Sequence, residues 1–205
     1  MRLTVSLETL RLTLLPCSPE HLLLLIDRPE GFAQAVGLRA ADGLRGFFLS
    51  DEVSPDWVAA LRNSPGPDPW RHGFFVVHRE SRSVIGTAGF KGPPDRTGVV
   101  EIAYGIVPSF EGQGYATEAA AALVGFAFAG DDVRLVCAHT LPASNASLWT
   151  LLEIHRKQFG KIIVRGVSTP GAAGRQADAH LAAQSEGSSH PTAESSRGCP
   201  GWSSP

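Results

Sequence analysis

The sequence predicts a mixed α+β domain followed by a segment without fold-forming patterns. Apolar patterns of strand and helix type alternate up to about residue 152, in the order β-α-α-β-β-β-α-β-α. In the later part, an alanine-rich helix between two strands indicates a βαβ unit. After about Gly166 the chain is rich in Ala, Gly, Ser and Pro, and such a composition buries too little apolar surface to offset its ordering entropy. We therefore expect one domain over residues 8–166 and a disordered low-complexity tail over residues 167–205.

The first half of the domain is expected to contain one strand and several helices. Two Ser-Pro pairs, Ser18-Pro19 and Ser54-Pro55, predict helix starts, because Ser caps a helix N-terminus and Pro is tolerated in its first turn. Residues 29–49 have a helical apolar pattern that glycines interrupt. The expected elements are a strand at 9–15, helices at 19–27 and 29–49, a helix beginning at 55, and a loop at 63–69.

The second half is expected to supply most of the sheet. Residues 73–77 and 84–90 are apolar and flank the polar turn 78–83, a pattern typical of a β-hairpin. A turn at Pro93-Pro94-Asp95 precedes the next strand. The further expected elements are a strand at 98–107, the alanine-rich helix at 117–129, a strand at 133–139, a short helix at 144–153, and one last strand at 161–167.

The composition is typical of a soluble globular protein and excludes several classes of partner. The chain has 205 residues, of which 43% are apolar and 19% charged, and its formal net charge is −2. This balance lacks the clustered basic residues that bind nucleic acid or anionic membranes, so we expect neither as a partner. The start of the chain has no signal-peptide pattern, and no apolar segment approaches the ~20 residues of a membrane span. Three cysteines without metal-ligand spacing, with Cys137 in an apolar run, indicate thiols in a reducing cytoplasm.

The segment between the strand at 98–107 and the alanine-rich helix carries the strongest functional signal. A buried strand runs into a loop with two glycines, and this loop opens a helix. Gly112 and Gly114 permit tight curvature, and the amides from Gln113 to Thr117 would face outward at the helix start. Such amides and the positive end of the helix dipole suit a phosphate or pyrophosphate. The loop is not a P-loop, because Gly-Lys-Ser/Thr is missing, and it also lacks the full G-x-G-x-x-G. A purely structural turn is the alternative.

Four motifs in the right order resemble those of the GNAT family of N-acetyltransferases. The similarity is greatest to the branch that includes the ribosomal-protein alanine N-acetyltransferases. Residues Gly112–Ala119 resemble the acetyl-CoA-binding motif Q/R-x-x-G-x-G/A, and Glu8–Leu12 resemble the opening E-T-x-R-L. Residues Val84–Phe90 resemble the v-I-G-x-x-G-f strand, and Pro142–Ser147 resemble the N-x-x-S start of a helix. The resemblance covers roughly residues 8–152.

This resemblance implies a GNAT-like fold, a cosubstrate and a reaction. The fold is a mostly antiparallel central sheet flanked by helices. The cosubstrate is acetyl-CoA, and a primary amine of a protein N-terminus or a small molecule attacks its thioester directly in a ternary complex. The backbone of Ile106 and Val107 would hold the pantetheine arm, because the splayed end of the central strand offers unpaired groups there. The implied cofactor-binding residues are Ile106, Val107, Gly112, Gln113, Gly114, Tyr115, Ala116, Thr117 and Asn145.

The resemblance also implies a proton acceptor and a proton donor. Glu101 is the candidate general base, since alternation places it on one strand face with Ala103 and Gly105; an exposed strand carboxylate is the alternative. Ser147 is the candidate that protonates the departing thiolate. Asn145 would bond the pantetheine, cap the last helix, or do both. The histidines have no paired ligand spacing and are interpreted as ordinary surface or strand residues, so no metal is expected.

Two departures from the family pattern motivate another function. Glu111 occupies the Q/R position, and an inward carboxylate would repel a pyrophosphate. After Glu153 the family's Leu-Glu-Lys-x-Gly-Phe-like signature and its last two strands are incomplete, as an altered or frame-shifted C-terminus would produce. The alternative is a catalytically weak or inactive acyl-CoA-binding remnant. A third interpretation, a different nucleotide-binding βαβ protein, requires ATP or NAD to outcompete CoA. The sequence is compatible with a monomer or a homodimer.

Overall fold

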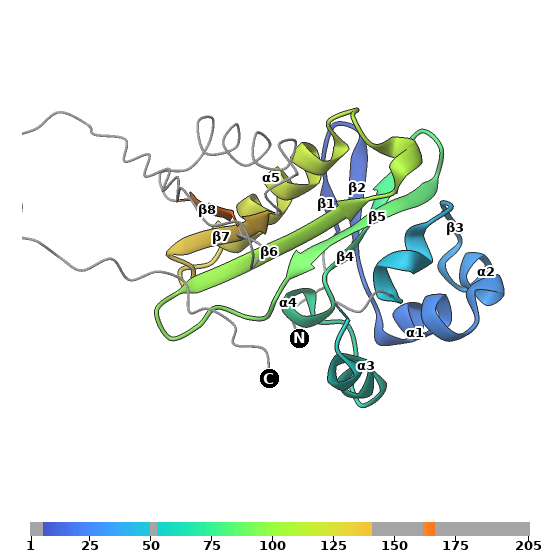
Figure 1. Cartoon of the computed structure of the whole chain (residues 1–205), viewed down its shortest axis with the longest axis horizontal. Helices are drawn as coiled ribbons and strands as arrows, with labels where there is room; N and C mark the ends of the chain where they lie inside the picture. Colours follow the sequence, from blue (N-terminus) through green and yellow to red (C-terminus); the bar gives the residue numbers. More distant parts are fainter. Residues whose placement is uncertain (1–5, 50–52, 141–161, 167–205) are drawn as a thin grey trace, which may run out of the picture.

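A single curved sheet forms the centre of the structure (Figure 1). The computed structural model describes residues 6–49, 53–140 and 162–166. The strands of the described residues are β1 (Leu7–Glu8), β2 (Leu12–Pro16), β3 (Arg39–Ala40), β4 (Phe74–His78), β5 (Ser83–Phe90), β6 (Val99–Ile106), β7 (Leu135–Thr140) and β8 (Ile162–Gly166). The helices are α1 (Pro19–Asp27), α2 (Phe32–Val36), α3 (Pro55–Arg62), α4 (Pro69–His72) and α5 (Tyr115–Phe128). Short 3-10 helices lie at η1 (Pro29–Gly31), η2 (Leu44–Phe48) and η3 (Pro108–Phe110).

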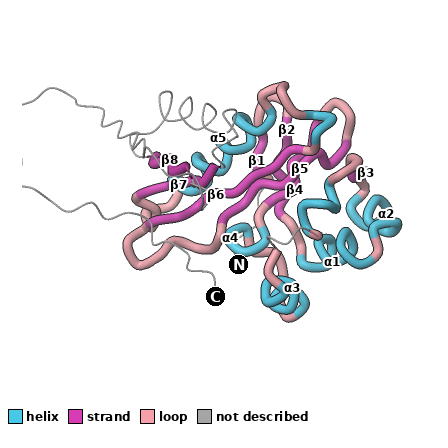
Figure 2. The backbone as a smooth tube through the Cα atoms, in the orientation of Figure 1, coloured by secondary structure: helices cyan, strands magenta, loops and turns pink. Residues whose placement is uncertain are grey.

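The sheet has the predicted, mostly antiparallel architecture. Its order is β1-β2-β4-β5-β6-β7-β8, and β3 pairs with β5 at the side. The pairs from β1 to β6 along this order are antiparallel, whereas β6–β7 and β7–β8 are parallel. A parallel pair needs a crossover connection, and α5 supplies it between β6 and β7 (Figure 2). The βαβ unit expected from the sequence is therefore present.

Helices cover both faces of the sheet. On the fully buried strand β4, neighbouring side chains point to opposite faces. Phe74 packs edge-on against Phe126 of α5, whereas Phe75 packs edge-on against Phe32 of α2. α5 therefore covers one face, and the helices of the N-terminal half cover the other. No helix within the described ranges has both the length and the apolar character needed to cross a membrane.

The prediction of broken helix over residues 29–49 is only partly right. The segment forms η1, α2 and η2, but between them it contributes the strand β3, which runs parallel to β5. The physical reason lies in the two glycines that interrupt the pattern. Gly37 ends α2 with a φ of +74°, and Gly43 precedes η2 with a φ of +89°. This left-handed backbone interrupts a continuous helix at both positions.

Other boundaries differ from the sequence prediction by a few residues. The strand expected at 9–15 is β2, which begins at Leu12 rather than Thr9, because the chain bends at Leu10 and Arg11 and leaves Leu10 87% exposed. The expected loop at 63–69 ends in a helix, α4, whose start is capped by the carboxylate of Asp68. The strand expected at 161–167 is confirmed as β8. The helix expected at 144–153 and the tail at 167–205 lie outside the described residues.

Candidate functional site

The connection from β6 to α5 forms a glycine-bearing helix start that is open to solvent. Gly112 and Gly114 have φ values of +73° and +80°, as the loop interpretation requires. Gly114 is the N-cap of α5, and the first bond of the helix runs from the Glu118 amide to the Gly114 carbonyl, at 3.1 Å. The amides of Tyr115 and Ala116 precede that bond and have no acceptor within the helix. Residues 111–114 are exposed, so an anion can reach the positive end of a helix of 14 residues.

The side chain of Tyr115 belongs to the core rather than to the anion-facing surface. Tyr115 is 7% exposed, and its hydroxyl lies 3.0 Å from Nε2 of His78. His78 is buried on β4, and its Nδ1 lies 2.9 Å from the Ser81 hydroxyl. From the sequence the histidines are expected to be surface or strand residues, and His78 is a buried strand residue. Of Tyr115, only the backbone amide is placed to meet a ligand.

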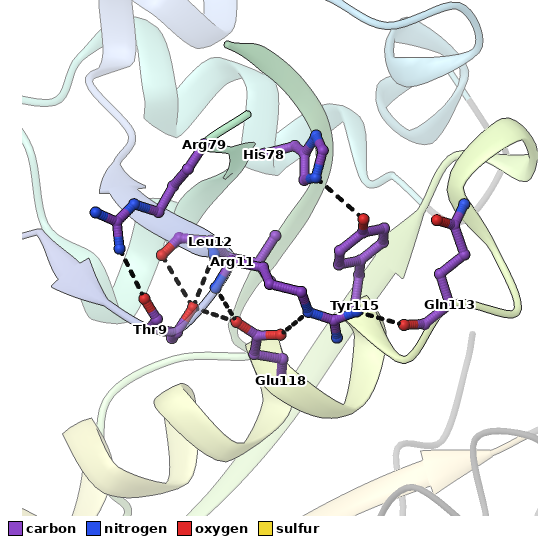
Figure 3. Close-up of polar contacts among 8 residues, drawn as sticks. All are labelled: Thr9, Arg11, Leu12, His78, Arg79, Gln113, Tyr115 and Glu118. Atoms are coloured by element: carbon purple, nitrogen blue, oxygen red, sulfur yellow. Dashed lines mark hydrogen bonds and ion pairs between the residues drawn. The ribbon is translucent and has the colours of Figure 1, made fainter. Parts of the chain in front are cut away.

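A partly buried acidic residue, Glu118, joins α5 to the segment just before β2 (Figure 3). The Glu118 carboxylate accepts from the Thr9 hydroxyl at 2.6 Å, from the Arg11 amide at 2.7 Å and from Arg11 Nε at 2.7 Å. Burial by itself raises the pKa of Glu118, but the hydrogen bonds from Thr9 and Arg11 and the charge of Arg11 outweigh it and lower that pKa. Glu118 is therefore ionised at neutral pH, which balances the charge of Arg11.

The pairing of β6 with β7 ends before the loop, in the region where the sequence predicted a splayed strand end. β6 pairs with β7 through Val99–Ile102, and its remaining residues continue toward the loop with no register partner on β7. The amide of Val107 donates to the Ile85 carbonyl on β5, at 2.9 Å. Backbone polar groups alternate between the two edges of a strand, so those of Ile106 face the β7 side, beyond the last register pair of Ile102 with Ala138.

The expectation of unpaired backbone groups fails at Val107. Its amide bonds Ile85, and its carbonyl accepts from the Phe110 amide at 2.9 Å. The cause is local: the chain turns into η3 directly after Val107, and the first turn of that helix uses the carbonyl. Ile106 therefore remains the candidate for a backbone contact to a ligand that enters between β6 and β7.

Glu101 lies on the face of β6 that points away from α5. Its neighbour Ile102 is paired across the sheet with Phe90, which packs against α5. Glu101 therefore points to the opposite face and is partly exposed there. On the same face, Phe47 of η2 packs over Gly105, where an added Cβ would lie 3.3 Å from its Cζ. The predicted alternation of Glu101 with Ala103 and Gly105 is thus confirmed.

Asn145 and Ser147 lie outside the described residues. Glu111 is exposed at the C-terminal end of η3, so its carboxylate is in water. Within the described ranges, no cluster of histidine, cysteine and acidic side chains has the form of a metal site.

Sequence reasoning missed the ion pair that ties the loop to β2. Arg11 and Glu118 are 107 residues apart, and neither was assigned a role. A signal was nevertheless available: both residues lie within the motifs quoted above, Glu8–Leu12 and Gly112–Ala119. The structure brings these two motifs side by side through Arg11 and Glu118.

Comparison with known proteins gives a family match over most of the chain. A family model described as an acetyltransferase (GNAT) domain matches residues 11–154. An uncharacterized N-acetyltransferase of Bacillus subtilis (strain 168), YjdG, is 32% identical over 92 residues, which are 45% of this chain and 52% of that protein. The chain thus spans about half the length of this curated relative.

Two solved structures give weaker, fold-level similarities. A putative GNAT-family acetyltransferase from Bordetella pertussis is 20% identical, with 73% of this chain and 87% of that chain covered and a TM-score of 0.49. A putative ribosomal-protein-serine acetyltransferase from Vibrio cholerae is 19% identical, with 75% and 84% covered and a TM-score of 0.47.

Proposed function

Because this chain belongs to the GNAT acetyltransferase family, we propose that it transfers an acetyl group from acetyl-CoA to a primary amine. The amine nitrogen attacks the thioester carbonyl in a ternary complex, the carbon–sulfur bond breaks, and CoA leaves as the thiolate. The acceptor is a protein N-terminus or a small-molecule amine. The observation that carries the proposal is the solvent-open start of α5, with left-handed glycines at 112 and 114.

We assign the pyrophosphate of acetyl-CoA to the amides at the start of α5. Amides from Gln113 to Thr117 would bond its oxygens, and the helix dipole would favour its charge. Gly112 and Gly114 allow the backbone to approach closely because they carry no Cβ. The pantetheine arm would lie between β6 and β7 and contact the backbone of Ile106. The family's further contacts would come from Asn145 and Ser147.

The first test is stabilisation by the cosubstrate. A ligand that binds only the native state raises the free energy of unfolding by about 2.7 kcal/mol at a concentration 100 times its Kd. We expect acetyl-CoA to raise the urea midpoint and the Tm accordingly, whereas ATP and NAD at equal concentration should have little effect. A protein indifferent to millimolar acetyl-CoA would contradict the proposed function.

Turnover separates an enzyme from a binding remnant. Glu111, which stands where the family motif has Gln or Arg, is the observation that favours a weakened enzyme. Incubation with acetyl-CoA and a panel of peptide N-termini and small primary amines should release CoA thiol, measured with a thiol reagent. Binding without thiol release from any amine would favour the acyl-CoA-binding remnant.

We propose Glu101 as the general base that accepts the amine's proton, directly or through water. The support is its position on the face of β6 that carries Gly105 and Phe47, away from α5. Glu101→Gln should lower kcat by roughly 10²–10⁴ with the best amine of the panel, because general-base catalysis contributes about that factor. Stabilisation by acetyl-CoA should persist in this variant. The matched control, Glu111→Gln, should keep kcat, and an unchanged kcat in Glu101→Gln would exclude the assignment.

A further inference from the structure

Arg11 is fixed against the glycine loop by three contacts from a distant part of the chain (Figure 3). Its Nε pairs with Glu118 at 2.7 Å, and its Cζ lies 4.4 Å above the centre of the Tyr115 ring. Its Nη1 donates to the carbonyl of Gln113 at 2.8 Å, a bond that joins residues 102 apart in sequence. The Arg11 side chain is thereby braced on one side by an ion pair and on another by an aromatic ring.

The partners of Arg11 are themselves held in place. Glu118 is oriented by the Thr9 hydroxyl and by the backbone amide of Arg11 itself. The Tyr115 ring is oriented by the bond between its hydroxyl and His78. The planar guanidinium donates in fixed directions, so anchoring Nε also fixes the direction of Nη1. The Gln113 carbonyl is consequently bound by a guanidinium whose position is already fixed, so this hydrogen bond costs little further side-chain entropy.

Arg11 binds Gln113, the loop residue that lies between two glycines. Gln113 is flanked by Gly112 and Gly114, whose missing Cβ atoms leave their backbone free to rotate. In a planar trans peptide, the carbonyl of one residue and the N–H of the next point in opposite directions. A hydrogen bond that pins the Gln113 carbonyl toward Arg11 therefore turns the Gly114 N–H away from Arg11.

We propose that Arg11 is a positioning residue for acetyl-CoA: it fixes the peptide between Gln113 and Gly114 and so aims the Gly114 amide at the pyrophosphate. The inference rests on the proposed function, in which the start of α5 binds that pyrophosphate. Its main effect is orientation rather than charge, because Glu118 already balances the guanidinium at 2.7 Å. Through this contact the segment just before β2 braces a loop whose own sequence has Glu111 where the family motif has Gln or Arg.

The decisive comparison uses two acetyl donors that differ only beyond the pantetheine arm. Acetyl-CoA carries the pyrophosphate, and S-acetylpantetheine has the same thioester without it. For Arg11→Ala and Arg11→Lys, we expect the KM for acetyl-CoA and its calorimetric Kd to rise about tenfold at nearly unchanged kcat. The kcat/KM for S-acetylpantetheine should stay at the wild-type value. Lys keeps the charge but loses the planar fork, so it should not restore the affinity.

Controls separate this role from a general loss of structure. Arg79 is an exposed arginine at the same end of the sheet, and its Nη1 donates to the Thr9 carbonyl at 3.0 Å. Arg79→Ala should change neither the KM for acetyl-CoA nor the KM for S-acetylpantetheine. Arg11→Ala leaves the Glu118 carboxylate without its cation, so the double variant Arg11→Ala with Glu118→Gln is also measured. It should be more stable than the single variant and show the same rise in KM.

Four results would overturn the proposal. They are a wild-type KM in Arg11→Lys, a wild-type KM in the double variant, an equal loss with both acetyl donors, and an equal loss in Arg79→Ala. The wild-type titration is made first: if the unaltered protein does not bind acetyl-CoA, the proposed function itself fails. If the wild type binds and the variants bind equally well, only the role of Arg11 fails.

Discussion

Gly114→Val is expected to abolish the stabilisation of this protein by acetyl-CoA. Gly114 has a φ of +80°, and a left-handed backbone costs an L-residue roughly 1–2 kcal/mol, more for a β-branched side chain. An added Cβ would also lie 3.4 Å from Nη2 of Arg11, so the two methyl groups of Val would press on that guanidinium. The start of α5 would shift, or the hydrogen bond from Arg11 to the Gln113 carbonyl would break. In either case the amides at the helix start would no longer point at one anion.

The measurement is urea unfolding with and without acetyl-CoA at a concentration that saturates the wild type. Gly125→Ala is the matched control on the same helix, because it is exposed and an added Cβ meets nothing within 4 Å. It should raise the stability of the free protein by up to about 1 kcal/mol, since Ala favours helix over Gly, and keep the full effect of acetyl-CoA. An undiminished effect in Gly114→Val would place the phosphate site elsewhere.

Much of the loop could be predicted from the sequence because its signals are local. A strand that runs into glycines and then into an alanine-rich helix determines where helical amides lack acceptors, and this needs no knowledge of the rest of the fold. The alternation that places Glu101 on one face of β6 is equally local. The two glycines have the left-handed φ values of such a loop, and Glu101 lies on the face of β6 that alternation predicts.

The features that were missed depend on pairing between distant segments. The amide of Val107 is bonded because β5 lies alongside with Ile85 opposite it, and no pattern within 98–107 reports that register. The pair Arg11–Glu118 depends on the segment just before β2 meeting the first turn of α5. The strand β3 was missed because two residues are too few to show a period, and its pairing with β5 decides its conformation.

Gly86→Ala is expected to destabilise the fold by about 3 kcal/mol or more. Gly86 is buried on β5, between β4 and β6, where the register of β4 with β5 shifts. An added Cβ would overlap the carbonyl oxygen of Gly105 and lie 3.1 Å from Cα of Ile106. These are backbone atoms of a paired strand, so no rotamer change relieves the clash, and overpacking of this kind costs roughly 1–3 kcal/mol and sometimes more.

Urea unfolding of Gly86→Ala beside Gly46→Ala tests this expectation. Gly46 is exposed in η2 and an added Cβ meets nothing within 4 Å, so its replacement should change the free energy of unfolding by no more than about 0.5 kcal/mol. A stability near that of the wild type in Gly86→Ala would mean that β5 and β6 can move apart. In that case acetyl-CoA binding should still weaken, because Ile106, the backbone contact proposed for the pantetheine arm, moves with β6. If the stability falls and the remaining native protein binds acetyl-CoA normally, the end of β6 is not where the pantetheine arm lies.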